Sequence, residues 1–422
     1  MDTATVFFGL LALAAALPAL DAALRLRRLA AGSARDACGV RPPGRILAVI
    51  PARAEGARVG DLAGDLKRES DSIDVLVLLD GPDPDAEARL ARDGVPYLSK
   101  KTPGPSKGHA LAFLAASIGD RLESYDFILV FDADMRLPEG FFRDLIVPEG
   151  TEAFQLPVRP AGVPGPGAPR VEALSLAQAM ADDRARDAEG LPVRLRGKAM
   201  GFSPGAFRAG PAAATRTTVE DSEATLRLLA RGVRVRALNG PIAFDEPSAE
   251  AGAMARSRSR WFGGQMKLFF TGFGDLLRLV ARSPKGAFVL AADIWFRPRI
   301  VLLGTLAFLA AASDVVMLVF SSNGAWSSVP PVGGGAAAAG AGGVQPWPIA
   351  LLVCLLLLSL LGKSALLFEW FSLALLRRRI GYPAEVPSIS LFDVVSSLKV
   401  WARAVFVGAA APSRWHRARP PA

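Results

Sequence analysis

The sequence has few residues of the kinds that cross-link small secreted domains or bind transition metals. Its 422 residues include only two cysteines, Cys38 and Cys354, and two histidines, His109 and His416. So few cysteines and histidines argue against a disulfide framework, a histidine-rich zinc site and paired-histidine chemistry. Charged residues make up 21% of the chain, against 51% hydrophobic residues. Such a chain is not disordered, because disorder requires low hydrophobicity.

The charge that is present is mostly basic. Lys and Arg number 49 against 40 Asp and Glu, which gives a formal net charge of +9. A basic chain can bind nucleic acid, but the arginines cluster beside apolar runs and not in blocks with interleaved aromatic residues. We therefore expect a surface next to anionic lipid headgroups, and no nucleic-acid partner.

Three apolar stretches are long enough to cross a bilayer as helices, which takes about 20 residues. They are residues 6–24, 300–320 and 349–376. Arg25, Arg27 and Arg28 follow the first stretch at once, and this favours a retained anchor over a cleaved signal. Arginines at 377–379 follow the last one. The positive-inside rule then predicts a multi-pass protein of the cell (plasma) membrane whose main domain is cytoplasmic.

These stretches divide the chain into segments. We expect an N-terminal transmembrane anchor at 1–30, an α/β domain at 45–265, interfacial helices at 266–299, a transmembrane helix at 300–320, a flexible extracytoplasmic loop at 321–346, a transmembrane helix at 347–377 and a cytoplasmic tail at 378–422. The tail contains a further apolar segment, residues 391–411, for which an interfacial helix and a fourth span both stay open.

The region from 45 to 236 alternates short apolar runs with helical stretches, which predicts βαβ units and a mainly parallel sheet. Three runs end directly at polar or turn residues: 46–50 at Pro51, 75–79 at Asp80, and 127–131 at Asp132-Ala133-Asp134. In open α/β sheets, ligands bind at the carboxyl ends of the strands. We therefore expect a ligand site at this edge.

Asp132 and Asp134 are the most specific signal in the sequence. Two carboxylates two residues apart after a buried strand present oxygens to one hard divalent cation, which usually keeps phosphate oxygens in its shell. Such a cation neutralises the charge that grows on a departing nucleotide diphosphate. A solvated turn is the alternative interpretation, because chance copies of this motif are common.

Further candidates precede or follow this pair. Lys107 opens a predicted helix after a Pro/Gly loop, which suits a phosphate contact, although many such lysines are solvated. Glu220 and Asp221 begin another helix, where acids are a normal capping preference as well as candidates for a base. Arg260 and Trp261 come before the predicted interfacial segment. Arginine binds diphosphate through its planar fork, and a basic stripe on an anionic leaflet is the alternative.

Taken in order, these motifs resemble the membrane-bound family 2 glycosyltransferases. This inverting GT-A group includes cellulose, hyaluronan and chitin synthases and many exopolysaccharide and glycolipid transferases. The resemblance covers about residues 45–265 and implies a GT-A-type α/β domain. It also implies a nucleotide-sugar donor, a UDP-sugar by preference, with Mg²⁺ or Mn²⁺ as cofactor and a lipid-linked or polysaccharide acceptor. Whether the protein forms an oligomer or binds partner subunits stays open.

The resemblance assigns roles to individual residues. Val219-Glu220-Asp221 corresponds to the Thr-Glu-Asp motif, so Asp221 is the implied catalytic base. Asp134 and Asp132 are the implied metal ligands. The implied nucleotide-sugar contacts are Pro51, Glu55, Asp80, Lys107, Asp132, Arg260 and Trp261, and the implied acceptor side comprises Lys198, Met200 and Glu220.

Three positions depart from the family pattern. Ala54 replaces the usual asparagine, Leu79 precedes Asp80 where a second aspartate is frequent, and Ser257 replaces the glutamine of the QxxRW motif. The last departure and the small number of spans favour adding one or a few sugars over processive polymerisation. A nucleotidyltransferase and a catalytically inactive membrane scaffold of a polysaccharide assembly complex are the alternatives.

Overall fold

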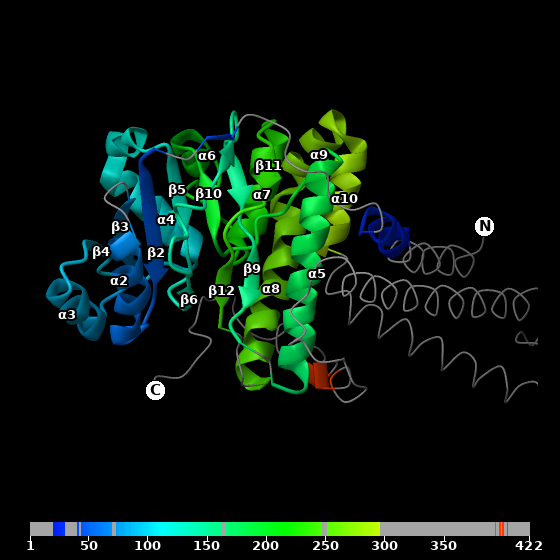
Figure 1. The fold of residues 1–422 in the computed structure, drawn as a ribbon. Coiled ribbons are helices and arrows are strands. Elements are labelled where there is room, and N and C mark those ends of the chain that lie inside the picture. Colours follow the sequence, from blue (N-terminus) through cyan, green and yellow to red (C-terminus); the bar gives the residue numbers. More distant parts are fainter. Residues whose placement is uncertain are drawn as a thin grey trace, which may run out of the picture. The chain divides into compact units, whose positions relative to one another are not determined.

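The computed structural model describes residues 20–29, 40–41, 44–69, 73–162, 165–246 and 251–295, with six further residues between 393 and 403. The chain divides into two compact units, residues 1–30 with 296–375, and residues 31–295 with 376–422. In the first unit only residues 20–29 are described, and they are helical. All labelled elements belong to the second unit (Figure 1).

The membrane predictions fall largely outside the described residues. Outside them lie residues 6–19 of the first predicted span, the predicted spans at 300–320 and 347–377, and the predicted loop at 321–346. Most of the predicted tail from 378 onward lies outside them as well. No helix within the described ranges is both long and apolar enough to cross a bilayer.

Twelve strands are assigned in the described residues. They are β1 (Val40–Arg41), β2 (Ile46–Ala52), β3 (Ile73–Leu79), β4 (Tyr97–Ser99), β5 (Phe127–Val130), β6 (Met135–Arg136), β7 (Val147–Pro148), β8 (Ala153–Gln155), β9 (Val158–Pro160), β10 (Met200–Phe202), β11 (Val235–Ala237) and β12 (Ala243–Asp245). The central sheet has the order β11-β8-β10-β5-β2-β3-β4. Only β10 runs antiparallel to its neighbours in that sheet. The predicted α/β class with a mainly parallel sheet is therefore confirmed.

Helices cover both faces of the sheet. They are α2 (Val59–Glu69), α3 (Pro84–Arg92), α4 (Lys107–Ile118), α5 (Ala168–Ala188), α6 (Pro204–Ala209), α7 (Glu220–Ala230), α8 (Ala251–Thr271), α9 (Phe273–Arg282) and α10 (Pro284–Trp295), with short 3₁₀ turns η1 (Gly56–Arg58) and η2 (Gly119–Ser124). Smaller pairings join β1 to β7 and β6 to β12 and β9.

Strand β2 is buried along its whole length because it lies in the middle of the sheet and is covered on both faces. Its side chains alternate between two cores, as the pleat requires. Ile46 and Ile50 enter one core with residues of α2, whereas Leu47 and Val49 enter the other with residues of α4. Because both faces of β2 are packed in this way, the carboxyl end of the strand is held in place beside the neighbouring strands.

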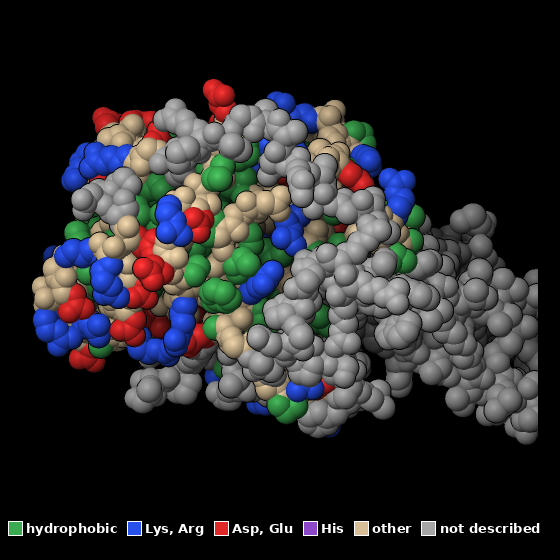
Figure 2. Space-filling view, in the orientation of Figure 1, with side chains coloured by type: hydrophobic (Ala, Val, Ile, Leu, Met, Phe, Trp, Pro, Cys, Tyr) green, Lys and Arg blue, Asp and Glu red, His purple; other side chains and the backbone are tan. Residues whose placement is uncertain are grey.

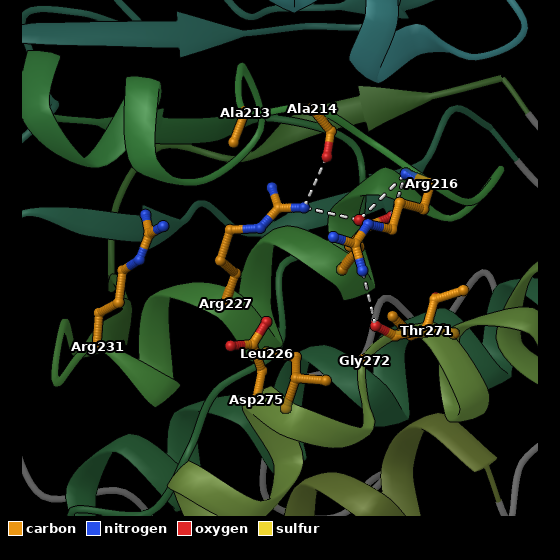
Figure 3. Close-up of a pocket in the computed structure, with 11 residues that line it drawn as sticks. Ala213, Ala214, Arg216, Leu226, Arg227, Arg231, Thr271, Gly272 and Asp275 are labelled. Atoms are coloured by element: carbon orange, nitrogen blue, oxygen red, sulfur yellow. Dashed lines mark hydrogen bonds and ion pairs between the residues drawn. The ribbon is translucent and has the colours of Figure 1, made fainter.

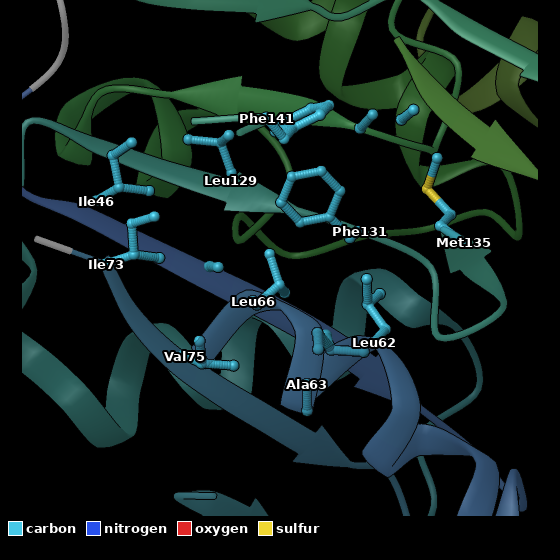
Figure 4. Close-up of a cluster of buried hydrophobic side chains, with 14 of the residues drawn as sticks. Ile46, Leu62, Ala63, Leu66, Ile73, Val75, Leu129, Phe131, Met135 and Phe141 are labelled. Atoms are coloured by element: carbon cyan, nitrogen blue, oxygen red, sulfur yellow. The ribbon is translucent and has the colours of Figure 1, made fainter. Parts of the chain in front are cut away.

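The core on the α2 side is rich in aromatic contacts (Figure 4). Phe131, which directly follows β5, meets the ring of Phe141 edge to face, with centroids 5.9 Å apart. Aromatic pairs in this geometry contribute beyond the area that they bury. Phe131 is fully buried. This packing anchors the residue immediately before Asp132, so the acidic turn starts from a rigid position.

The outer surface over α2 and α3 carries charges of both signs side by side (Figure 2). Arg68 pairs with Asp65 at 2.5 Å, and Arg89 pairs with Asp93 at 2.5 Å. Exposed pairs of this kind each contribute little to stability, with a median of about 0–1 kcal/mol. These helices therefore owe their position to their buried faces.

The long helices α5 and α8 lie side by side (Figure 1). Arg258 of α8 lies 3.7 Å from the carboxylate of Glu172 in α5. Asp393, from the predicted tail, accepts a hydrogen bond from the Gly167 amide and pairs with Arg170. A tail residue thus lies against the first turn of α5. Helix α8 is continuous through residues 265 and 266, where the sequence placed a boundary.

Helices α9 and α10 occupy most of the segment predicted to be interfacial. Leu279 and Leu290 are buried together with Leu226 of α7. On α9, Leu277 stays exposed, and Phe270 at the end of α8 is 73% exposed. One face of this helical segment therefore packs on the domain, while large apolar side chains of the other face remain uncovered.

The close approach of β8 and β10 yields the first prediction. A Cβ added at Gly201 would lie 2.1 Å from the ring of Phe154, its register partner, which is fully buried. We expect Gly201→Ala to lower the free energy of unfolding by about 1–3 kcal/mol through overpacking. Urea unfolding followed by circular dichroism measures this change.

Gly205→Ala is the matched control, because a Cβ there meets nothing within 4 Å and the residue lies in α6. It should leave stability unchanged or raise it by about 0.4–1 kcal/mol. Equal stabilities for the two variants would contradict the tight β8–β10 contact.

Candidate functional site

Lys107 and Asp132 meet at the carboxyl edge of the central sheet. The turn after β5 carries Asp132, and Lys107 is the first residue of α4. Lys107 Nζ lies 2.5 Å from Asp132 Oδ1 and donates to the Gly197 carbonyl at 2.7 Å. Burial opposes charge on Asp132, but Lys107, Lys198 and Arg260 outweigh this effect and hold its pKa below the usual value. Asp132 is therefore ionised at neutral pH.

Lys198 joins this cluster from the loop before β10. Its ammonium lies 2.5 Å from Asp245 Oδ2, and Asp245 ends β12. Burial alone would lower the pKa of Lys198, but Asp245, Asp134 and Asp132 together raise it. Asp245 Oδ1 is buried and has no hydrogen-bond partner within the described residues. Two ammonium groups thus lie beside the acidic turn.

Glu220, Asp221 and Arg260 form the other side of the cluster. Burial and the neighbouring Asp221 raise the pKa of Glu220 to about 7, against the opposing effects of Lys107 and Arg260. Burial lowers the pKa of Arg260, although Glu220, Asp132 and Asp221 all favour its charge. Its Nε atom is buried without a hydrogen-bond partner in the described part of the chain. Arg260 therefore retains an unused donor beside these acids.

Asp221 presents its two carboxylate oxygens differently. Oδ1 accepts from the Ser222 amide at 2.7 Å and from the Ser222 hydroxyl at 3.2 Å. Oδ2 lies 3.9 Å from Arg194 Nη2, beyond hydrogen-bond distance. A Cβ at Gly197 would sit 3.6 Å from Oδ2, so the absence of a side chain there keeps this oxygen accessible. The arrangement leaves Oδ2 able to accept a proton.

Asp80, predicted to contact the nucleoside, is fully buried. Its carboxylate pairs with Arg53 at 2.5 Å and Lys100 at 2.9 Å, and accepts from the Gly104 amide at 2.9 Å. Arg53 also donates to the Gly104 carbonyl. Asp80 thus fixes the loop from 100 to 104, which leads to Lys107. Its contact with a nucleoside stays a prediction.

The remaining predicted residues are spread over several environments. Pro51 lies within β2, and Glu55 follows it on the turn before η1. Between them, Ala54 has φ +51°, a left-handed conformation that asparagine tolerates better than alanine. The side chain of Met200 is fully buried in the core on the α4 side, and Trp261 packs on the cluster around α7. Neither side chain lies in the charged cluster.

Several residues of the site were missed by sequence reasoning. Asp245 follows the same rule as the other acids, since it ends a strand, but β12 has only three residues and too weak a pattern to detect. Glu223 accepts from the amides of Arg216 and Thr217 and from the Thr217 hydroxyl. It thereby shapes the loop that enters α7. Only the tertiary structure reveals this role.

The oxygen donors around the acidic turn suit a hard divalent cation. Asp132 and Asp134 are carboxylates, the ligand type that Mg²⁺ and Mn²⁺ prefer. No group of three or more ligating side chains occurs within the described ranges. An ion here would therefore need further oxygens from a bound phosphate or water. This donor set fits a metal that is shared with a phosphorylated ligand.

A pocket of about 240 Å³ lies elsewhere, beside α7 and the junction of α8 and α9 (Figure 3). None of the predicted site residues lines it. Arg227 donates to the Ala214 carbonyl and to Glu223, and Arg216 donates to the Thr271 carbonyl. These arginines brace the loop against the helices, so the pocket is a structural feature beside the site.

The raised pKa of Glu220 leads to a prediction about stability. Its folded pKa of about 7 lies above the ordinary 4.5, so the group stabilises the fold below about pH 4.5, and that contribution is lost as pH rises towards 7. In Glu220→Gln no carboxyl group titrates at this position, so this loss of stability does not occur. Relative to the native chain, we expect the variant to gain on the order of 1–2 kcal/mol between pH 5 and pH 8, measured by chemical unfolding.

Glu149→Gln is the control, since Glu149 is exposed on a turn. Its stability difference from the native chain should not depend on pH. An equal pH dependence in both variants would show that Glu220 titrates like a surface acid.

Two solved structures of glycosyltransferases are similar to this chain. The mannosyltransferase PcManGT from Pyrobaculum calidifontis, in complex with GDP-Man and Mn²⁺, is 13% identical, with a TM-score of 0.49 over 86% of this chain and 97% of that one. Glucosyl-3-phosphoglycerate synthase from Mycobacterium tuberculosis, in complex with Mn²⁺, UDP and glucosyl-3-phosphoglycerate, is 21% identical. That match covers 48% of this chain and 72% of that one, with a TM-score of 0.35. No curated protein matches the chain.

The family assignment rests on a match to a family of known sequences. Residues 127–376, more than half of the chain, match the family described as glycosyl transferase family group 2. The matched region begins at β5 and includes the acidic turn, Lys198, Asp221 and Arg260. The chain therefore belongs to glycosyl transferase family group 2, and it is a glycosyltransferase with a GT-A-like α/β fold.

Proposed function

We propose that this glycosyltransferase moves a sugar from a nucleotide-sugar, by preference a UDP-sugar, to a lipid-linked or growing polysaccharide acceptor at the cell membrane. The reaction inverts the anomeric configuration, and Asp221 is the general base. The observation that carries the proposal is the separation of roles around Asp221: one oxygen is held by Ser222, and the other is free of hydrogen bonds among the described residues.

The base acts on the acceptor. An acceptor hydroxyl next to Asp221 Oδ2 passes its proton to that oxygen as the hydroxyl oxygen attacks the anomeric carbon. The bond from that carbon to the diphosphate breaks on the opposite side, and its electron pair leaves with the nucleotide. One displacement with one carboxylate base inverts the configuration. The bonds from Ser222 keep Oδ1 occupied and so direct the proton to Oδ2.

The cations of the site stabilise the leaving group. Lys107, Lys198 and Arg260 surround the acidic turn, and the buried Nε of Arg260 is an unused donor. Preorganised positive groups of this kind stabilise charge that develops in the transition state. When bound to Asp134 and Asp132, Mg²⁺ or Mn²⁺ supplies further Lewis-acid stabilisation of the diphosphate. The neighbouring enzymes named above were solved with Mn²⁺ and with UDP or GDP-Man, which supports the same donor class.

The acceptor side is proposed to face the membrane. The end of α8 and the outer face of α9 expose six large apolar side chains: Met266, Phe269, Phe270, Phe273, Leu277 and Val280. Basic residues accompany them at 267, 278, 282 and 285. An amphipathic helix with a basic polar face is typical of interfacial helices that lie on anionic lipid. This surface supports a cytoplasmic domain at the plasma membrane with a lipid-linked acceptor.

The decisive experiment measures nucleotide release by the detergent-purified full chain across UDP-, GDP- and dTDP-sugars, with Mn²⁺ or Mg²⁺. Asp221→Asn should lower turnover by about 10²–10⁴-fold because it removes the base, while donor affinity changes less than about twofold. Asp134→Asn should instead remove metal-dependent donor binding. The anomeric configuration of the product, read by NMR, should be inverted.

Asp275→Asn is the matched control, since Asp275 also lies in the first turn of a helix but pairs with Arg278. It should retain turnover. Full activity of Asp221→Asn would refute the base assignment. Absence of release from every donor by the folded native chain would favour the inactive-scaffold alternative.

The membrane contact is tested in the full chain in lipid nanodiscs. Leu277→Cys carries a fluorophore after Cys38 and Cys354 are replaced by serine, and the lipids carry bromine quenchers. We expect strong quenching at position 277 because the side chain lies among acyl chains. A label at Ile146→Cys is the control, since Ile146 is 44% exposed but lies on the loop before β7. Equal quenching at both positions would contradict a lipid-facing α9.

A further inference from the structure

A line of polar contacts runs from Asp221 to helix α10. The Ser222 hydroxyl, 3.2 Å from Asp221 Oδ1, accepts a hydrogen bond from Arg194 Nη2 at 2.8 Å. The same Nη2 lies 3.9 Å from Asp221 Oδ2. The other end of the guanidinium, Nη1, donates to the Asp293 carbonyl at 3.4 Å. Arg194 therefore joins the start of α7 to α10.

Asp293 is itself fixed by a buried charge network. Its Oδ2 lies 2.9 Å from Arg186 and 3.1 Å from Arg196, and these arginines also pair with the α5 carboxylates Asp182 and Asp183. Burial disfavours the ionised form of Asp293, but Arg196, Arg186 and Arg194 outweigh it and lower its pKa. Removing one partner of such a network is strongly destabilising, and two arginines hold the Asp293 carboxylate in place.

The segment that carries Arg194 is also tied down by its backbone. The Leu195 amide donates to the Thr225 hydroxyl at 3.0 Å, and the Arg196 amide donates to Gln155 Oε1 at 2.8 Å. The Arg194 side chain is only 11% exposed. Its position is thus set by α7, β8 and α10 together, before any substrate binds.

We propose that Arg194 is a positioning residue that orients the Asp221 carboxylate from an anchor on α10. This inference rests on the proposed role of Asp221 as base. Arg194 holds Ser222, and Ser222 holds Oδ1, so the free oxygen keeps one direction.

Within the part of the chain that the structure describes, charged groups lie beside Asp221 on three elements. Glu220 adjoins it on α7, Arg260 approaches from α8, and Arg194 approaches from the loop before β10. Lys107, from α4, acts on the neighbouring Glu220.

The test measures kcat/KM against pH for the full-length Arg194→Met variant. Loss of the cation disfavours the carboxylate, so the rising acidic limb should move upward by about 0.5–1 pH unit. kcat should fall about tenfold, with the donor KM changed less than about twofold. The loss should be greatest at low pH.

Arg227→Met is the matched control, since Arg227 lies in α7 and is 12% exposed in its pair with Glu223. Its acidic limb should coincide with that of the native chain. A purely structural role of Arg194 would lower activity in both variants without moving the limb. That result would overturn the proposal.

Arg194→Lys is measured as well, because it keeps the charge and tests the proposal even if the methionine variant does not fold. It loses the fork that bridges Ser222 and α10, so kcat should fall about three- to tenfold while the limb stays in place. Native behaviour in both properties would refute the positioning role.

Asp221→Asn separates the two levels of inference. If that variant is active, the base assignment of the proposed function fails. If it is inactive but Arg194→Met shows no shift of the limb, only the inference about Arg194 fails.

Discussion

Charge compensation at the carboxyl edge of the central sheet is the constraint on which the site depends. Asp80 and Asp132 follow strands of the central sheet, and Asp245 ends β12 of the small sheet beside it. Each of the three carboxylates lies 2.5 Å from a basic side chain. A buried carboxylate without such a partner is strongly unfavourable. In the proposed function, the lysines and the arginine of these pairs supply the positive charge that a nucleotide diphosphate requires, so the contacts that stabilise the edge would also prepare it for its ligand.

The proposed base, Asp221, is supported differently from the proposed donor side. Glu223 organises the loop before α7, and Ser222 holds one oxygen of Asp221. Arg194 then connects Ser222 to α10. These contacts lie in buried or half-buried surroundings, where hydrogen-bonded networks restrict geometry strongly. Helix α9, part of the proposed lipid-facing surface, shares a buried core with α10 through Leu279 and Leu290. The proposed membrane contact and the support of the proposed base therefore belong to adjoining helices.

Much of the fold was predictable because its signals are local. The apolar runs that became β2, β3 and β5 alternate with helices. Strand β3 ends at Leu79, directly before Asp80, as predicted, whereas β2 continues through Pro51 to Ala52 and β5 ends at Val130, one residue early. Asp132, Lys107, Glu220 and Arg260 do act on one another electrostatically, as a shared site requires. Met200 was placed on the acceptor side, but its side chain is buried in the core, because in this short strand the sequence pattern does not tell which face each residue presents.

The sequence alone determined the class of the fold, the strand ends that carry Asp80 and Asp132, and the family to which the chain belongs. Periodicity, turn residues and motif order are short-range properties, so they can be read without coordinates. Only the tertiary structure decided which cation meets which carboxylate. Lys107 reaches the Gly197 carbonyl across 90 positions, and Arg186 reaches Asp293 across 107. Such partners are selected by the packing of helices and strands, and no local pattern encodes them.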